Sequence, residues 1–379
     1  MKRSSPLAVP GGESGLAVAD ENSPPLGKMG QARLLHWATR ALKAILPPIA
    51  AVALALLVSA ALLAFNGFPA TDVFTIMVTG VFHDVRSTSE VLLKATPLIL
   101  IGVGLCVAFR CSIWNIGAEG QLYAGAIAAT AVGVSFAGLP AWLHIALILA
   151  AGAAAGAFWA AIAGLLRIFF NASEIVTTIM LNYIAIILTD FLVTGPLKDP
   201  AASYPQSAKF LRDLWLLRFL PPTRLHIGIL IAVALAVAAY VFLFRSSAGY
   251  AVRVVGINPH AARYAGINVP KNILLAIAIS GAMAGLAGAV EIDGVTFRLY
   301  QDISPGYGFE AIAVALLANN NPLGAIFSGI LFAALRSGSE LMQINAQVPQ
   351  VLVFVIQGLV ILSVVGFAAF KRQTARPAE

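Results

Sequence analysis

Long apolar stretches alternate with short polar segments along most of the 379-residue chain. Many of these stretches approach or exceed about 18 residues, the length at which an apolar helix can cross a bilayer. We place about ten membrane segments near residues 48–66, 91–109, 119–138, 141–166, 174–194, 225–244, 272–290, 306–318, 323–337 and 348–370. The pattern predicts an all-α, polytopic helical membrane protein in which some segments are short or broken helices.

Composition supports a membrane protein and argues against other classes. The chain is 59% hydrophobic and 11% charged, whereas soluble domains carry about a quarter charged residues. The pI near 9.6 does not indicate nucleic-acid binding, because basic residues beside membrane spans are expected. Cys106 and Cys111 lie in or beside one span, which excludes a disulfide framework or a cysteine zinc site. We therefore expect no metal site and no nucleic-acid partner.

The ends of the chain differ from its apolar body. We divide it into a cytoplasmic tail over 1–46, a transmembrane domain over 47–370 and a second cytoplasmic tail over 371–379. Residues 31–45 have an apolar face with basic residues at its edge, which favours a helix on the membrane surface. The alternative is an extension of the first span, against which Pro47 and Pro48 argue.

The distribution of basic residues predicts the orientation. With both termini inside, 15 of the 24 Lys and Arg residues fall on the cytoplasmic side, including those of loop 245–271. Residues 196–224 then face the opposite side. We expect a multi-pass protein of the bacterial cytoplasmic (inner) membrane with cytoplasmic N- and C-termini.

Two polar interruptions break the pattern of simple spans. Residues 110–121, "RCSIWNIGAEGQ", place polar groups and glycines between apolar runs, and "NNNP" separates the short segments 306–318 and 323–337. These two segments either cross fully or form a re-entrant pair. Irregular backbone at membrane depth is tolerated inside protein or beside water, and broken helices commonly mark a solute site.

Polar residues near these interruptions are candidates for a translocation path. They are Asn115, Glu119, Gln121, Thr178, Asn182, Gly306, Tyr307 and Glu310. An acid in the membrane usually has a function, yet Glu119 could equally complement the dipole of its own helix. Glu174, Thr178 and Asn182 have the i, i+4, i+8 spacing of one helix face. Asn171 would be the N-cap residue of that helix, with Glu174 at its third position. Interhelical hydrogen bonding explains this stripe slightly better than a path does.

Glycine pairs within the spans have a simpler interpretation. Gly152–Gly156 and Gly281–Gly285 have the small-residue spacing typical of close helix packing.

The segment "GINPHAARYAGINVP", residues 256–270, reads as a short helix with a signal at each end. Asn258 suits the N-cap, Pro259 the first helical position and Gly266 the position after the C-cap. So short a helix is marginal alone in water, which favours docking on a partner protein. We expect Ala261, Ala262 and Arg263 near that contact; the alternative is an ordinary solvated turn.

Motifs of hydrolytic enzymes are absent from the sequence. It contains no G-x-x-x-x-G-K-[ST] phosphate loop, no H-E-x-x-H and no G-x-S-x-G. We therefore expect no catalytic residues and no bound cofactor in this chain.

Four segments of the chain resemble one family of transport proteins. "GYAVRVVGINPHAARYAGINVPK" resembles the coupling loop of ABC importer permeases, in the family that includes branched-chain amino acid, ribose-type sugar and nucleoside permeases. "NIGAEGQLYAGA", "NASEIVTTIMLNYIA" and "FEAIAVALLANNNPLGAI" resemble its nucleoside branch. The resemblance covers roughly residues 90–365. Ala318 and Glu310 depart from the usual residues of the family, and Glu310 leaves the substrate in question.

The resemblance implies a permease subunit of an ATP-driven importer, most simply for nucleosides. It implies an ABC ATPase subunit that uses ATP, a second homologous permease subunit or a homodimer, and an extracytoplasmic solute-binding protein. It assigns Asn258, Pro259, Ala261, Ala262, Arg263 and Gly266 to the helix that couples to the ATPase. A simple-sugar permease and a self-sufficient secondary transporter are the alternatives.

Overall fold

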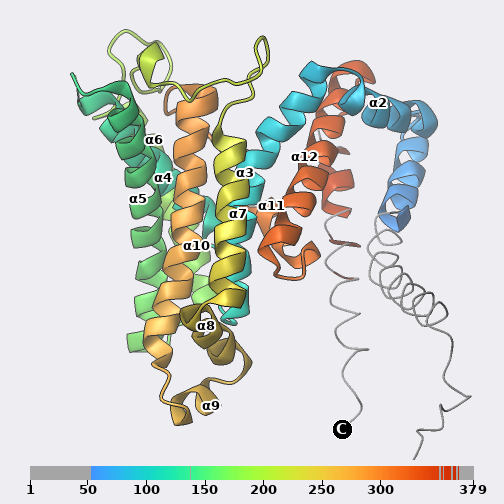
Figure 1. Ribbon diagram of the computed structural model, residues 1–379. Coiled ribbons are helices and arrows are strands. Elements are labelled where there is room, and N and C mark those ends of the chain that lie inside the picture. Colours follow the sequence, from blue (N-terminus) through green and yellow to red (C-terminus); the bar gives the residue numbers. More distant parts are fainter. Residues whose placement is uncertain are drawn as a thin grey trace, which may run out of the picture. The chain divides into compact units, whose positions relative to one another are not determined.

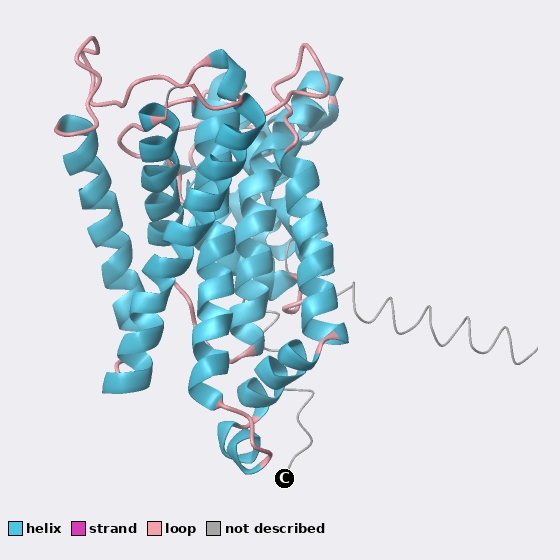
Figure 2. Ribbon diagram, turned by 60° about the vertical axis from the view of Figure 1, so that its left-hand side comes forward, coloured by secondary structure: helices cyan, strands magenta, loops and turns pink. Residues whose placement is uncertain are grey.

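The computed structural model describes residues 53–136, 138–349, 351–352, 354–359, 362–363 and 366. They belong to one compact unit, Pro48–Glu379. The expected surface helix over 31–45 and the two tails lie outside the described residues. The described residues form helices and loops with isolated bridges but no strands, in agreement with the predicted all-α class (Figure 2).

The helices follow one another with short connections, except for one long loop before α7 (Figure 1). After a first helix, Ala53–Phe65, they are α2 Ala70–Phe82, α3 Val85–Arg110, α4 Ala118–Ser135, α5 Ala141–Phe170, α6 Glu174–Thr194, α7 Gly228–Arg245, α8 Ser247–Ile257, α9 Pro259–Tyr264, α10 Val269–Glu291, α11 Tyr307–Leu317 and α12 Pro322–Asn345. A short 3-10 helix, η1 Arg212–Leu214, lies in the long loop, and a π-helix, η2 Ile292–Thr296, extends α10.

Six described helices are long and apolar enough to span a membrane: α3, α5, α6, α7, α10 with η2, and α12. The other predicted segments within the described residues form shorter or less apolar helices, so the expected number of about ten is not confirmed. Helix α12 continues to Asn345, eight residues beyond the predicted end, whereas α11 has only 11 residues. The pair is therefore unequal: α12 can span a bilayer, and α11 by itself cannot.

Helix α10 is the centre of the bundle and packs against α3, α4 and α5. Glycines make this possible: a Cβ on Gly285 would lie 2.7 Å from the Cα of Gly156. A Cβ on Gly152 would lie 3.0 Å from the carbonyl oxygen of Gly285. The helices therefore meet backbone to backbone, and the predicted role of these glycines in helix packing is confirmed.

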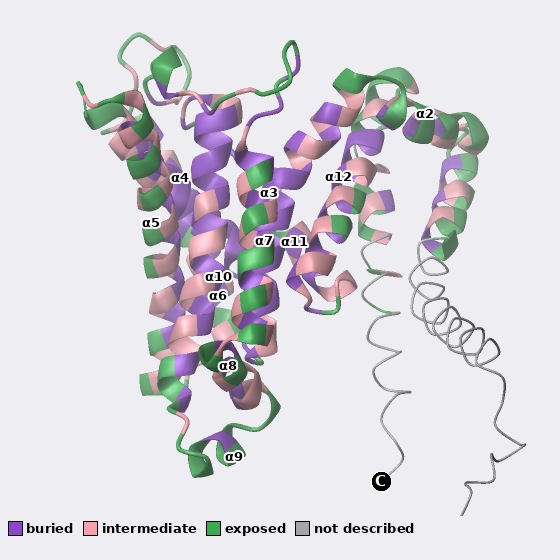
Figure 3. Ribbon diagram, viewed as in Figure 1, coloured by how far each residue is buried: buried purple, intermediate pink, exposed green. Residues whose placement is uncertain are grey.

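The outer faces of the bundle are apolar. On α5 and α6, Phe158, Phe169, Ile187 and Phe191 are each more than 60% exposed. The apolar window of α3 is 89% buried, against 22% in α5 and in α6, and Figure 3 shows the same contrast between α3 and α5. A continuous apolar outer face is costly in water and is expected of helices that face lipid.

The turn between α5 and α6 differs from the prediction. Asn171 does not cap α6; it ends α5 in the left-handed conformation, with φ of 52°. Ser173 is the N-cap residue of α6, and Glu174 forms an ion pair with Arg167 of α5. Asparagine tolerates the left-handed conformation that often ends a helix. The predicted N-cap role of Asn171 is therefore wrong, because the residue ends α5 instead.

Candidate functional site

The first polar interruption forms a compact network of hydrogen bonds, here called the knot, at the start of α4. Asn115 and Gln121 exchange two amide hydrogen bonds, each 2.9 Å long. The Asn115 side chain also donates to Ser280 Oγ of α10 at 2.9 Å and accepts from Gly117 N at 3.0 Å. Both amides are at most 1% exposed, so this irregular backbone is satisfied inside the protein.

Helix α6 closes the same interruption from the other side. Asn182 accepts a hydrogen bond from Gly120 N at 2.7 Å and donates one to Ile116 O at 2.9 Å. Thr178 Oγ1 accepts from Ile116 N at 3.3 Å. Thr178 and Asn182 thus make hydrogen bonds between helices, which is the interpretation of the stripe that the sequence analysis slightly favoured over a solute path. Glu174, the first member of the stripe, pairs with Arg167 instead.

Glu119 joins the first interruption to the start of α11. It lies in the first turn of α4, and its Oε2 accepts a hydrogen bond from Gly308 N, 2.6 Å away, in the first turn of α11. A Cβ on Gly308 would lie 2.6 Å from Glu119 Cα, so only glycine allows this approach. Ser304 Oγ accepts from Tyr307 N at 3.2 Å and completes the start of α11. The carboxylate therefore lies at the N-termini of two helices, where negative charge is stabilised.

Arg336 of α12 binds the other side of the start of α11, a role that the sequence pattern did not indicate. Its guanidinium donates to Glu310 Oε1 at 2.5 Å and to Pro305 O at 3.3 Å. It also lies 5.1 Å from the centre of the Tyr307 ring. Arg336 is 8% exposed. A single side chain of α12 thus contacts three residues around the break before α11.

The charge network continues from Arg336 toward α3. Glu340 lies one helical turn along α12 and approaches Arg336 Nε at 3.9 Å. It also pairs with Lys94 of α3. The sequence does contain a signal, since Arg336 and Glu340 have the i, i+4 spacing of a helical ion pair.

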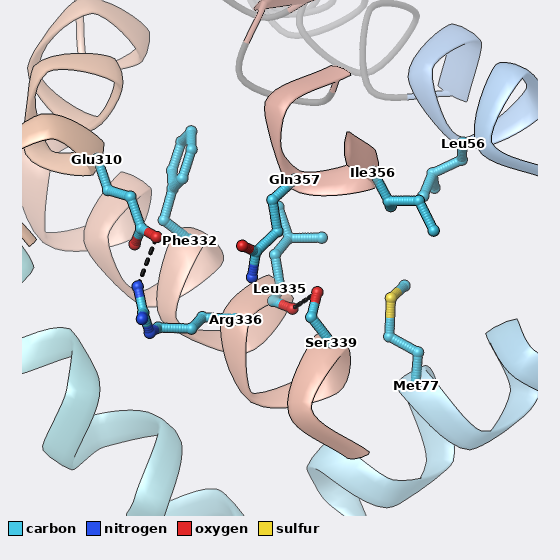
Figure 4. A pocket seen from close by; sticks show the side chains of 9 residues that line it. All are labelled: Leu56, Met77, Glu310, Phe332, Leu335, Arg336, Ser339, Ile356 and Gln357. Atoms are coloured by element: carbon cyan, nitrogen blue, oxygen red, sulfur yellow. Dashed lines mark hydrogen bonds and ion pairs between the residues drawn. The ribbon is translucent and has the colours of Figure 1, made fainter. Parts of the chain in front are cut away.

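A small pocket lies beside the Glu310–Arg336 pair (Figure 4). Its polar lining residues are Glu310, Arg336, Ser339 and Gln357, and its apolar lining residues are Leu56, Met77, Phe332, Leu335 and Ile356. The pocket therefore combines hydrogen-bonding and apolar groups close to the broken helix.

The predicted path residues fall into two groups. Asn115 and Gln121 bond to each other, and Thr178 and Asn182 bond to the backbone at residues 116 and 120, whereas Gly306, Tyr307 and Glu310 lie where α11 begins. Glu119 connects the groups through its hydrogen bond from Gly308 N. No cluster of three or more potential metal ligands occurs among the residues that the structure describes.

The short helix α9, in the segment 256–270, has the predicted ends. The Asn258 side chain accepts from His260 N at 2.9 Å and from Ala261 N at 3.0 Å, and Pro259 occupies the first turn. Gly266 follows the C-cap with φ of +77°. Ala262, however, is fully buried within the chain, whereas Tyr264 is 95% exposed. Ala262 therefore packs α9 onto its own protein, and the free face of α9 is formed by its exposed neighbours.

Contacts connect the α8–α9 region to the knot at the start of α4. Ser112 Oγ donates to Gly256 O of α8 at 2.6 Å. The thiol of Cys111 lies 3.8 Å from Asn272 O of α10. Residues 111 and 112 lead directly into Asn115, so these contacts place α8 and α10 next to the first interruption.

Replacing Glu119 by glutamine tests whether its charge has a role beyond holding helices. The amide oxygen can still accept from Gly308 N, but the interaction with two helix N-termini weakens by about 1 kcal/mol. We expect a small loss of thermal stability in detergent and at least tenfold slower transport in proteoliposomes. If both Glu119→Gln and Asn115→Ala transport normally, these residues do not line the path, and the helix-dipole role of Glu119 suffices.

Comparisons with known proteins identify related transport proteins. The family model described as branched-chain amino acid transport system, permease component, matches residues 87–365. A guanosine ABC transporter permease protein of Bacillus subtilis is 36% identical over 331 residues, covering 86% of this chain and 94% of that protein. A glucose ABC transporter permease protein of Haloferax volcanii is 38% identical, covering 86% and 88%.

A third relative comes from another bacterium. A nucleoside ABC transporter permease protein of Lactococcus lactis is 30% identical, covering 85% of this chain and 91% of that protein. No solved structure matches the chain. These similarities extend over the helices that carry both polar interruptions and the short helix α9.

Proposed function

Because the chain belongs to the family of permease components of branched-chain amino acid transport systems, we propose that it is the transmembrane subunit of an ATP-driven ABC importer that carries nucleosides. The observation that carries this proposal is the similarity, over most of both chains, to permeases named for guanosine and for nucleosides. The motifs "NIGAEGQLYAGA" and "FEAIAVALLANNNPLGAI" support the same branch.

The remaining parts of the importer are separate chains. An ABC ATPase subunit hydrolyses ATP, and a solute-binding protein delivers the substrate outside the membrane. A second homologous permease, or a second copy of this chain, completes the pore. Both termini and residues 245–271 face the cytoplasm of a bacterial inner membrane, in line with the distribution of basic residues.

The coupling step follows from the contacts of α8 and α9. The ATPase binds the exposed face of α9 and displaces it during its cycle. The hydrogen bond from Ser112 Oγ to Gly256 O, 2.6 Å long, transmits the displacement to the hydrogen bonds around Asn115. Glu119 passes it to Gly308 and to the start of α11. Tyr307 and Glu310 then change position along the solute path.

A sugar is the second candidate substrate, and one specific observation favours it. The glucose permease of Haloferax volcanii is as similar as the guanosine permease, at 38% identity. The pocket beside Glu310 does not separate the two substrates, because its cavity volume of about 20 Å³ is too small to hold either of them.

Uptake by the reconstituted importer tests the proposed function. The permease, its ATPase and its binding protein are placed in proteoliposomes and supplied with radiolabelled guanosine or glucose. We expect ATP-dependent accumulation of guanosine and no accumulation of glucose. Glucose uptake instead would identify the sugar alternative, and uptake that continues without ATP would indicate a secondary transporter.

Reversing the charge on the free face of α9 tests the coupling role. Arg263 is exposed, and Arg263→Glu places a negative charge where a basic side chain would pair with the ATPase. We expect at least a tenfold loss of ATPase co-purification, with normal amounts of permease in the membrane. The measurement is the ratio of ATPase to permease after affinity purification.

The conservative variant Arg263→Lys is the matched control and should retain the ATPase. Ala262→Glu is a poor test, because Ala262 is fully buried and the change would disturb the packing of α9 itself. Unchanged ATPase binding and uptake in Arg263→Glu, and also in Tyr264→Ala, would show that α9 is not the coupling element.

A further inference from the structure

A cavity lies between the end of α3 and the turn that joins α11 to α12. Its volume is about 120 Å³, whereas a single water needs only about 10–15 Å³, so the cavity has room for a ring system. It is separate from the pocket beside Glu310, with which it shares no lining residue. The residues that line it are Phe109, Ser112, Ile113, Trp114, Leu316 and Asn320.

Two aromatic rings form part of this lining. The rings of Phe109 and Trp114 lie 5.2 Å apart and are tilted by 43°. Trp114 is 44% exposed, although Ile113 before it is fully buried. Exposed tryptophans are common where a helix bundle meets the membrane surface, and that role would explain the Trp114 ring alone. It does not explain the cavity beside the ring, where a flat ligand can stack on the indole.

The polar side chains of the lining offer hydrogen-bond acceptors. Asn320 is 9% exposed, and its Oδ1 has no hydrogen-bond partner within the described residues. Buried polar atoms are nearly always paired, so a donor on a bound molecule or on water is expected here. Ser112 Oγ donates its hydrogen to Gly256 O at 2.6 Å, which leaves the hydroxyl oxygen only as an acceptor. None of the described side chains that line the cavity is charged, so these acceptors suit a neutral ligand that carries N–H groups.

The end of α3 holds the turn that forms one side of the cavity. Arg110 Nε donates to Asn320 O at 3.0 Å, and Arg110 Nη2 donates to Asn319 O at 3.2 Å. Asn319 and Asn320 both adopt the left-handed conformation, with φ of 53° and 54°, which asparagine tolerates better than most residues. The contact of Ser112 with Gly256 places the cavity next to α8. In the proposed orientation of the importer, this is the cytoplasmic side.

We propose that this cavity is a base-binding site at the cytoplasmic end of the solute path, where the purine ring of a nucleoside binds before release. The ring stacks on Trp114, which directly precedes the knot, and its N–H groups donate to Asn320 Oδ1 and Ser112 Oγ. The sugar stays in water at the exposed edge of Trp114, because the cavity holds a ring system and not a whole nucleoside. The inference rests on the proposed function, which supplies the nucleoside and the orientation.

Binding of radiolabelled guanosine to the complex of permease and ATPase in nanodiscs, without the binding protein, tests this site. We expect saturable binding that Trp114→Ala weakens at least fivefold, because the stacking surface is lost. Trp114→Phe should retain most of the affinity, since a ring remains. Trp142→Ala is the matched control: Trp142 is 72% exposed at the start of α5 and does not line the cavity, so the affinity should not change.

A pair of neighbouring glycine variants tests the polar contact. Asn320→Gly removes the unpartnered Oδ1, and Asn319→Gly is its control, because Asn319 does not line the cavity and glycine accepts the positive φ of both positions. We expect at least fivefold weaker guanosine binding for Asn320→Gly and unchanged binding for Asn319→Gly. The melting temperature in detergent is measured for both, so that binding is compared between folded proteins.

Equal guanosine affinity in Trp114→Ala, Asn320→Gly and the parent protein would overturn the proposal. So would the absence of saturable binding, which would leave water as the occupant of the cavity. Glucose that competes as well as guanosine would overturn it too, since a sugar offers no flat ring to stack. Guanosine binding without guanosine uptake would contradict only the proposed substrate, whereas uptake without binding at this site would contradict only the site, so the two failures are distinguishable.

Discussion

Replacing Arg336 by glutamine is expected to give the largest loss of function among single polar substitutions in this protein. The change leaves the Glu310 carboxylate without its partner at 2.5 Å, in a site where both side chains are at most 14% exposed. Breaking one side of a buried ion pair typically costs about 3–5 kcal/mol. We expect a large fall in melting temperature in detergent and loss of uptake by proteoliposomes.

The double variant Glu310→Gln with Arg336→Gln separates charge from position. It removes the unpaired charge, so it should be more stable than Arg336→Gln alone. It should nevertheless transport poorly, because the contacts of Arg336 with Pro305 O and the Tyr307 ring are also lost. Arg336→Lys, which keeps the charge, should retain part of the activity. Normal uptake by the double variant would show that Arg336 serves stability alone.

The helices were predicted well from the sequence where the runs of apolar residues are long. Segments such as 174–194 and 272–290 were placed within a few residues of α6 and α10, because helices that cross a membrane require long, uninterrupted apolar runs. The predictions failed at places governed by local backbone geometry. Asn171 ends a helix instead of starting one, and helix α2, Ala70–Phe82, was not expected because its polar residues interrupt the apolar run.

The candidate site was only partly predictable for a different reason. The acids Glu119 and Glu310 stand out in a membrane segment, and the end signals of α9 are local. Which group satisfies which is a matter of tertiary contact. Arg336 reaches back 26 residues to Glu310, and Lys94 reaches 246 residues forward to Glu340. Periodicity within one helix cannot reveal such pairs.

Replacing Gly285 by leucine should abolish the accumulation of folded permease. A Cβ at this position already lies 2.7 Å from Gly156 Cα and 2.9 Å from Gly156 N, and backbone atoms cannot move aside as a flexible side chain can. Overpacking of a core commonly costs about 1–3 kcal/mol; here the leucine must also separate α10 from α5. The measurement is the monodisperse fraction of detergent-solubilised protein on size-exclusion chromatography.

A leucine elsewhere in the same pair of helices is the matched control. Ala154 is exposed on α5 between Gly152 and Gly156, so Ala154→Leu adds apolar surface toward lipid and should leave the folded fraction unchanged. Gly285→Ala adds only the Cβ and should fall between the two. If Gly285→Leu and Ala154→Leu accumulate equally well, α10 and α5 do not require direct backbone contact. The close packing at the centre of the bundle would then not hold the fold together.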